Sequence, residues 1–435
     1  MTNKIFHPYT PFSAIERGFS NLVRGEGIHL FDDAGNQYVD IVSSWWACAL
    51  GHGHPKVVKA IQEQAAVLQH SITGSLTHPN VLALAERLAE LMPTPDRHSV
   101  FASDGCSAVE AALKVAVQYW HNIGRPENTW LIGMDQGYHG DSLGALGVGF
   151  VDDFHKPFER AVSHPAKLPF PVPTADDPEG FEPSRAVIEQ HADQIAAVIV
   201  EPLCLGSAGM KMYSAGYLKE LAACCSENAV LLIIDEVAMG FGRTGERFAF
   251  NHADIDPDIV CVGKALTAGY MPLSAAIVKD KLYDTFTDAG ETDHTFYHGN
   301  TYAGHPIGCA AALAALDIYE AEGTVERGAE MAEKMKRWML PMAELDCVAE
   351  LRFLGMIGVV ELKPETKPLI AKMKQSLFEQ GYLFRPLGTM FYLMPPLIIS
   401  NDELKAAVYA LQQTIEEFCC CLLYTSDAAD EYQRV

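Results

Sequence analysis

Residues 230–245 read V-L-L-I-I-D-E-V-A-M-G-F-G-R-T-G, and this stretch decides the fold. The apolar run 230–234 is short and bounded, which is typical of a strand buried in a parallel sheet. Asp235 follows at its carboxyl end, where side chains of an open α/β sheet face the ligand crevice. Lys264 comes 29 residues later, just after the next apolar run, 259–262. Two successive strands thus end in opposite charges, and an ordinary salt bridge would explain these two residues alone.

The pattern around this stretch indicates two structural units. Short apolar runs alternate with stretches of helical spacing before residue 306, which favours a mainly parallel sheet between helices. A long helical stretch, 306–322, and two short strands then predict a smaller α+β unit, which we expect an N-terminal hairpin around 32–36 to join. The predicted strands are 99–102, 129–134, 196–200, 230–234 and 259–262 in the large unit and 356–361 and 391–393 in the small one; the predicted helices include 55–68 and 80–91. We therefore expect small-domain segments at 1–54 and 306–418 around a large cofactor-binding domain at 55–305.

Composition excludes several classes of protein. The net charge of the 435 residues is −24, which argues against a general binder of nucleic acid or anionic membranes. No apolar run approaches the roughly 20 residues that span a bilayer, and the first residues lack the layout of a signal peptide. The eleven cysteines form no spaced framework, so we expect a reduced, cytoplasmic protein without disulfides. His52 and His54 have no acid or cysteine beside them in G-H-G-H-P, so we expect no metal.

The end of the chain differs in kind from the rest. Residues 421–435 read C-L-L-Y-T-S-D-A-A-D-E-Y-Q-R-V, and the part up to Glu431 resembles a translated sequencing adapter. We treat 419–435 as a non-native tail and exclude it from the fold. A natural polar tail is the alternative, and we expect Leu422, Leu423 and Tyr424 to pack against nothing.

The stretch D-E-V-x-x-G-F-G-R-T-G, followed by G-K-A-L, resembles the class III aminotransferases, which depend on pyridoxal phosphate and have fold type I. The resemblance covers about residues 5–418. It implies that Lys264 binds the cofactor aldehyde as a Schiff base and that Asp235 keeps the pyridine nitrogen protonated. The rival reading of G-F-G-R-T-G as a dinucleotide motif is weak, because five residues separate it from the strand.

The resemblance also implies a phosphate loop and a ring-stacking residue. Ser103-Asp104-Gly105-Cys106 lies between the strand 99–102 and a helix predicted from Ser107, with Ser107 and Glu110 as its capping box. Gly105 and Cys106 would offer backbone N–H groups to the phosphate, although relatives usually carry a small hydroxyl residue at Cys106. Tyr138 in G-Y-H-G would stack on the cofactor ring. His139 is assigned no role, and Asp141 is a possible pocket residue.

Dimer formation is a further implication. In the family, the loop that here contains Gly299, Asn300 and Thr301 crosses a dimer interface, and its threonine binds the partner's cofactor phosphate. We therefore expect a homodimer, with Gly299 near substrate and with Asn300 in a place where relatives carry proline.

Three features favour one substrate among those of the family. His7-Pro8-Tyr9-Thr10, Ser43-Ser44-Trp45-Trp46 and Arg385-Pro386 resemble the branch that aminates a biotin precursor, 8-amino-7-oxononanoate. Trp45 and Tyr138 would line an apolar slot, Tyr9 would reach the reacting end, and Arg385 would clamp the terminal carboxylate. Adenosylmethionine is the expected amino donor, with lysine left open. Another ω-amino-acid aminotransferase is the alternative function.

Overall fold

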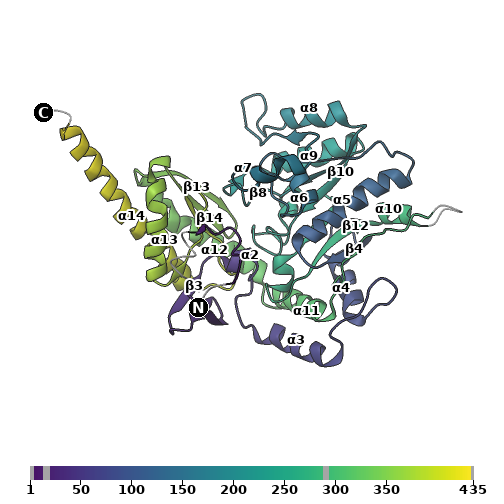
Figure 1. Ribbon diagram of the computed structural model, residues 1–435, viewed down its shortest axis with the longest axis horizontal. Helices are drawn as coiled ribbons and strands as arrows, with labels where there is room; N and C mark the ends of the chain where they lie inside the picture. The colour runs from purple at the N-terminus through teal and green to yellow at the C-terminus, as the bar shows by residue number, and fades with distance from the viewer. Residues whose placement is uncertain (1–3, 13–19, 288–292, 433–435) are drawn as a thin grey trace.

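The computed structural model describes residues 4–12, 20–287 and 293–432, with side chains through Cys419. Two units lie side by side in it (Figure 1). The second of the two cavities described below is lined by residues of both units. The large unit contains a seven-stranded sheet, and the small unit contains a three-stranded sheet and the N-terminal strands.

The large sheet is mainly parallel, as the sequence predicts. The strand order is β4-β12-β11-β10-β7-β5-β6; β12 runs antiparallel to both its neighbours, and the remaining pairs are parallel. All five predicted runs form strands here, whereas β12 and β6 were not predicted. The strands are β4 (Arg97–Ala102), β5 (Trp130–Met134), β6 (Lys167–Leu168), β7 (Ile195–Val200), β10 (Leu231–Asp235), β11 (Ile259–Val262) and β12 (Ser274–Lys279).

Helices cover both faces of this sheet. Alternate residues of a strand point to opposite faces, and in β10 Leu231 and Ile233 pack in one hydrophobic cluster while Leu232 and Ile234 pack in another. The first cluster includes α5 and the second includes α4, α9 and α11, so the sheet is buried on both sides. The helices are α3 (Pro55–Val67), α4 (Pro79–Glu90), α5 (Gly105–Asn122), α6 (Leu143–Val148), α7 (Asp152–His155), α8 (Glu182–His191), α9 (Ala215–Glu227), α10 (Asp280–Tyr283) and α11 (Pro306–Ala321), with 3₁₀ turns η1 (Lys156–Ala161), η2 (Ala249–Ala253), η3 (Lys264–Thr267) and η4 (Asp284–Phe286) and a small ribbon of β8 (Cys204–Leu205) and β9 (Lys211–Met212).

The small unit joins the two ends of the chain. Its antiparallel sheet has the order β13-β14-β16, and β15 pairs in parallel with β3, which brings the N-terminal hairpin to the C-terminal unit. The hairpin itself is β2 with β3, and β1 extends it. The elements are β1 (Leu22–Glu26), β2 (His29–Asp32), β3 (Gln37–Asp40), α12 (Thr324–Met339), η5 (Leu340–Glu344), β13 (Val348–Leu354), β14 (Ile357–Leu362), η6 (Pro364–Leu369), α13 (Ile370–Glu379), β15 (Tyr382–Leu383), β16 (Met390–Leu393) and α14 (Asn401–Tyr432).

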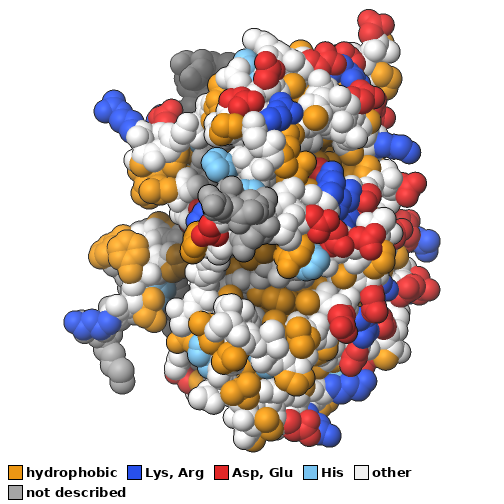
Figure 2. Space-filling view, turned by 90° about the vertical axis from the view of Figure 1, so that its right-hand side faces the viewer, with side chains coloured by type: hydrophobic (Ala, Val, Ile, Leu, Met, Phe, Trp, Pro, Cys, Tyr) orange, Lys and Arg blue, Asp and Glu red, His pale blue; other side chains and the backbone are white. Residues whose placement is uncertain are grey.

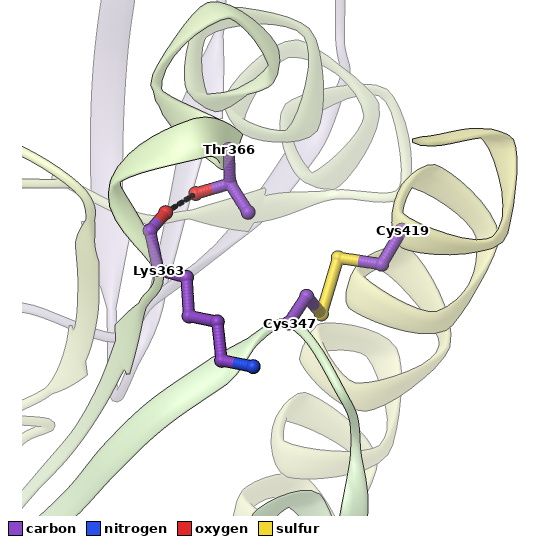
Figure 3. Close-up of a disulfide and its surroundings, with 4 residues drawn as sticks. All are labelled: Cys347, Lys363, Thr366 and Cys419. Carbon is purple, nitrogen blue, oxygen red and sulfur yellow. Dashed lines mark hydrogen bonds between the residues drawn. A yellow bond between two sulfur atoms is a disulfide. The ribbon is translucent and has the colours of Figure 1, made fainter. Parts of the chain in front are cut away.

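The expectation that the chain has no disulfide is wrong. Cys347, just before β13, is bonded to Cys419 in α14, with 6.2 Å between their Cα atoms (Figure 3). The backbone around Cys347 is itself held, because its carbonyl accepts a hydrogen bond from Lys363 N–H at 2.8 Å. Sequence spacing could not reveal the pair, since 72 residues separate the two cysteines and only the docking of α14 brings them together.

The last helix continues beyond this bond. Backbone helix reaches Tyr432, and the final turns of α14 project away from the small unit (Figure 1). The predicted exposure of Leu422, Leu423 and Tyr424 concerns side chains outside the described residues. Within the described part of the chain, no helix combines the length and apolar character needed to cross a membrane.

Candidate active site

A cavity of about 510 Å³ lies at the carboxyl end of the large sheet. Asp235 and Lys264 both line it, because β10 and β11 are paired parallel neighbours, Asp235 is the last residue of β10 and Lys264 lies two residues after β11. The two residues that the sequence singled out are therefore brought to one cavity. Lys264 has a φ of 45°, a left-handed conformation that costs free energy in a residue with a Cβ atom and is typical of functional sites.

The side-chain amine of Lys264 lacks a hydrogen-bond or ion-pair partner among the described residues. Its Nζ lies 4.8 Å from the centroid of the Trp46 ring, and no hydrogen bond or ion pair joins it to another described residue. Burial lowers the pKa of its amine, although the charges of Asp235 and Glu201 oppose that effect. A lower pKa favours the neutral amine, which is the nucleophilic form. Asp235 and Lys264 do not form a salt bridge with each other, so a purely structural ion pair does not account for these two residues.

Asp235 instead pairs with His139. Its Oδ2 lies 2.7 Å from His139 Nδ1, and its Oδ1 accepts a hydrogen bond from Val237 N–H at 3.1 Å. Both side chains are almost fully buried. The pair holds the carboxylate in one orientation at the cavity wall, so His139, to which sequence reasoning gave no role, belongs to the site.

The predicted phosphate loop lies at the start of α5. Gly105 and Cys106 line the cavity, and a Cβ atom on Gly105 would lie 2.6 Å from Val237 Cγ1. The predicted capping box is wrong: α5 begins at Gly105, and its N-cap is Asp104, which accepts from Ser107 N–H at 2.9 Å. Glu110 accepts a short hydrogen bond from the Ser142 hydroxyl instead. The helix starts two residues earlier than predicted because Asp104, and not Ser107, caps it.

Cys106 adapts to its place through Ser142. Its Sγ lies 2.9 Å from Ser142 Oγ and accepts from Ser142 N–H at 3.3 Å. Burial raises the pKa of this thiol, which keeps it protonated. The departure from the family's small hydroxyl residue therefore leaves a side chain that is hydrogen-bonded to Ser142.

Tyr138 is held from its backbone by Glu201. Tyr138 N–H donates to Glu201 Oε1 at 2.9 Å, and Gly206 N–H donates to Oε2 at 3.0 Å. Burial raises the pKa of the Glu201 carboxyl to about 7, although the His139 charge and these hydrogen bonds oppose the rise. Sequence reasoning missed Glu201, but a signal was present: an acid follows the apolar run 196–200 directly, as Asp235 follows its own.

A second cavity, of about 450 Å³, adjoins the first and shares Lys264, Tyr138 and Asp141 with it. Tyr9, Trp45 and Arg385 line it together, although they come from three distant parts of the chain. Tyr9 donates to Asp141 Oδ1 at 2.6 Å, and Tyr138 donates to Oδ2 at 3.1 Å. The three residues that were predicted to bind substrate, Tyr9, Trp45 and Arg385, thus lie beside Lys264.

The tandem tryptophans have separate environments because of an unusual turn. Residues 43–46, labelled α2 (Ser43–Trp46), have φ angles of 48°, 44°, 74° and 71°, so the turn is left-handed. Ser43 Oγ donates to Met394 O, and Trp46 Nε1 donates to Tyr392 OH at 3.1 Å. Trp46 is buried beneath Lys264, whereas Trp45 is 41% exposed at the second cavity.

The motif G-F-G-R-T-G has a structural use. It forms turns that open no helix, which excludes the dinucleotide reading. The buried Arg243 guanidinium donates to Pro395 O at 2.6 Å and to Ser43 Oγ at 3.3 Å. The motif therefore links the large unit to the small unit and to the turn that presents Trp45.

Gly299, Asn300 and Thr301 do not reach either cavity of this single chain. All three are exposed. The segment before them packs along α5, where Gln118 Nε2 donates to His294 O and Thr295 O at 3.1 Å. Their predicted roles depend on a second chain and stay predictions.

The family model described as Aminotransferase class-III matches residues 14–415. The chain belongs to this family. It is 37% identical to the adenosylmethionine-8-amino-7-oxononanoate aminotransferase of Synechococcus elongatus, over 94% of this chain and 99% of that protein. The crystal structure of the Methanocaldococcus jannaschii enzyme of the same name has a TM-score of 0.91 and 34% identity, covering 95% of this chain and 97% of that one. An omega transaminase of Pseudomonas jessenii, solved in complex with PMP, has a TM-score of 0.89 and 26% identity over 95% and 96% of the two chains.

The cavity fits pyridoxal phosphate, the cofactor of class III aminotransferases. Lys264 provides an amine without a competing ion pair, and Asp235 provides a carboxylate whose position His139 fixes. The amino end of α5 provides backbone N–H groups at Gly105 and Cys106, where a helix favours an anion. No cluster of three or more His, Cys, Asp or Glu among the described residues could hold a metal ion. The prediction that the protein binds no metal stays a prediction.

Proposed function

We propose that this chain transfers an amino group to the 7-oxo carbon of 8-amino-7-oxononanoate and so produces 7,8-diaminononanoate, a step of biotin synthesis. The observation that carries the proposal is that Tyr9, Trp45 and Arg385 line one cavity beside Lys264. Relatives at 37% and 34% identity, which bear the name of this activity, support it. Adenosylmethionine is the proposed amino donor, which would become the corresponding keto compound.

Lys264 and Asp235 are the proposed catalytic residues. The cofactor, when bound, supplies an aldehyde for covalent attachment and a ring that accepts electrons. Asp235 would hold the proton on the pyridine nitrogen, and His139 keeps that carboxylate aimed. Lys264 Nζ would hold the cofactor and later carry the proton between two carbon atoms, which its lowered pKa favours.

The second cavity suits an aliphatic chain with a charged end. The Arg385 guanidinium carbon lies 4.0 Å from the centroid of the Trp45 ring, which fixes the cation at an apolar wall. Arg385 forms no ion pair with another described residue; its guanidinium donates a hydrogen bond to the Tyr392 hydroxyl, and its other donors would bind a carboxylate. Tyr9 would orient the reacting end; its pKa is raised to about 12 by burial and by Asp141, so its hydroxyl stays protonated and can donate.

A donor screen tests this function. Holoenzyme would be incubated with 8-amino-7-oxononanoate and either adenosylmethionine, lysine, ornithine or 4-aminobutyrate, and 7,8-diaminononanoate followed by mass spectrometry. We expect product with adenosylmethionine and none from Lys264→Ala. If 7,8-diaminononanoate forms with lysine but not with adenosylmethionine, lysine is the amino donor. Turnover of other ω-amino acids without any diaminononanoate would favour a different ω-amino-acid aminotransferase.

We further propose a homodimer. Ile72, Leu76 and Tyr302 are large hydrophobic residues that are 58%, 60% and 59% exposed, and exposed apolar residues are informative where they gather in one patch. Their segments pack together, because Thr73 Oγ1 lies 3.4 Å from Ala303 O and the rings of His70 and Tyr302 are 5.2 Å apart. The patch is therefore continuous with Thr301, the residue expected to reach a second chain.

Other apolar surface is exposed on the large unit. Figure 2 shows its end away from the small unit, where hydrophobic side chains line a recess bordered by charged ones.

A cytoplasmic location is also part of the proposal. In a reducing cytoplasm Cys347 and Cys419 would be thiols.

A further inference from the structure

A buried histidine lies directly behind the second cavity. His155, the last residue of α7, has a side chain that is 3% exposed, and it does not line either cavity. Its Nε2 lies 3.4 Å from Asp141 Oδ1, yet it has no well-formed hydrogen bond to any described residue. It is therefore a buried polar atom directed at the carboxylate that Tyr9 and Tyr138 share.

The tautomer of His155 follows from its other nitrogen. Val151 N–H donates to His155 Nδ1 at 3.1 Å, so Nδ1 carries no proton and Nε2 carries one. Burial lowers the pKa of this imidazole, although Asp141 opposes that effect, and the lowering favours the neutral ring. The side chain thus offers Asp141 a single N–H donor without adding a charge.

Aromatic contacts hold the imidazole in place. The Tyr138 ring stacks on it at 5.9 Å with an interplanar angle of 19°, and Phe150 and Phe154 contact it edge-on at 5.6 and 6.0 Å. Phe154 in turn contacts the Tyr9 ring at 5.5 Å. His155 is therefore fixed relative to both tyrosines, whereas Asp141 is 54% exposed and depends on its hydrogen-bond donors for its orientation.

We propose that His155 is a positioning residue: its Nε2–H orients Asp141, and Asp141 in turn holds the Tyr9 and Tyr138 hydroxyls at the junction of the two cavities. Three donors then converge on one carboxylate, and the one from the interior anchors the other two. This role deepens the proposed function and rests on it, because Tyr9 and Tyr138 are its substrate-facing residues.

Three variants separate positioning from packing. His155→Phe keeps an aromatic ring but removes the Nε2 donor and also the Nδ1 acceptor of Val151 N–H. His155→Gln restores an N–H near the position of Nε2, and His164→Phe is a matched control. His164 contacts the same Phe150 ring at 5.0 Å and bonds Gly147 O, but it has no contact with Asp141.

We expect His155→Phe to raise KM for 8-amino-7-oxononanoate about five- to tenfold, equivalent to about 1–1.4 kcal/mol, with a smaller change in kcat. His155→Gln should recover most of this loss, and His164→Phe should behave as wild type. An unchanged KM in His155→Phe, or a His155→Gln variant as impaired as His155→Phe, would overturn the proposal.

A double-mutant cycle supplies a readout other than activity. The thermal midpoint of holoenzyme would be compared for His155→Phe, Asp141→Ala and the double variant. The effect of His155→Phe should at least halve in the Asp141→Ala background; an undiminished effect would mean that His155 only packs. His155→Gln enters the same cycle if His155→Phe does not fold. If wild type does not use 8-amino-7-oxononanoate, the proposed function fails, and this cycle still decides the link between His155 and Asp141.

Discussion

Arg385 places a permanent cation against the Trp45 ring with no described acid beside it. If it binds the substrate carboxylate, its removal loses charge-assisted hydrogen bonds worth about 2–3 kcal/mol. We expect Arg385→Ala to raise KM for 8-amino-7-oxononanoate about 30- to 150-fold, measured by steady-state kinetics.

Two controls accompany this prediction. Arg385→Lys keeps the charge but loses the planar fork, so it should recover only part of the affinity. An analogue without the terminal carboxylate should be almost insensitive to Arg385→Ala. Equal losses for substrate and analogue would mean that Arg385 supports the fold instead.

His52 predicts a pH dependence of stability. Burial of its imidazole lowers its pKa, but the hydrogen bonds to Asp40 and Cys48 outweigh this and raise the pKa to about 9. The pair with Asp40 is 3.0 Å long and mostly buried. Because the folded pKa is above the unfolded value near 6.5, the stabilisation is complete below about pH 6.5 and is lost as pH rises through about 9.

Urea unfolding measures this effect. His52→Gln should lower the free energy of unfolding at pH 6, and the difference from wild type should shrink by pH 10. His98 is a matched control, since its pair with Asp280 is 2.9 Å long but has side chains 47% and 41% exposed. A deficit for His52→Gln that is constant with pH would contradict the prediction.

At the scale of elements, the disulfide connects α14 to the strand that begins beside Cys347. It closes a loop of 72 residues, for which loop-closure entropy predicts stabilisation of about 4 kcal/mol, an upper figure because measured values are often smaller. We expect Cys347→Ser to lower the unfolding free energy by about 2–4 kcal/mol under oxidising conditions.

The same variant provides its own control. Dithiothreitol should destabilise the wild type by a similar amount and leave Cys347→Ser unchanged. Cys347 is the better residue to replace, because Cys420 lies next to Cys419 in the sequence and could form the bond in its place. Equal stability of wild type with and without reductant would show that the bond contributes nothing.

At the scale of the whole molecule, the exposed patch of Ile72, Leu76 and Tyr302 should be covered by a second copy of the chain. Analytical ultracentrifugation should find twice the chain mass, and Ile72→Asp should weaken the association. Val172→Asp is the matched control, because Val172 is 71% exposed but lies in the loop before α8. A fully active monomer would refute the dimer.

A mixing experiment tests whether the sites are shared. If Thr301 serves the partner's cofactor, Lys264→Ala and Thr301→Ala chains should complement each other, because one site of a mixed dimer receives both intact residues. Activity of the mixture no greater than that of Thr301→Ala diluted to the same concentration would place Thr301 outside the partner's site.

Much of the fold was predictable because it depends on local patterns. Five strands of the large sheet contain short apolar runs. Adjacent parallel strands carry their terminal residues to the same edge, which is why Asp235 and Lys264 could be paired in advance. β12 was missed because its run, S-A-A-I-V-K, begins with small residues and has weak signal. The start of α5 was placed two residues late because Ser107 was taken as the cap, whereas Asp104 caps the helix.

The sequence by itself determined the family, five of the seven strands of the large sheet, and the residues Lys264, Asp235, Tyr138, Tyr9, Trp45 and Arg385 as candidates. Only the tertiary structure decided what holds them: His139 against Asp235, Glu201 beneath Tyr138, the left-handed turn that separates Trp45 from Trp46, and the bond between Cys347 and Cys419. The physical reason is the distance along the chain. Apolar periodicity and strand-end charges are properties of neighbouring residues, whereas hydrogen-bond partners 63 to 96 residues apart and a cysteine pair 72 apart are chosen by how the units pack.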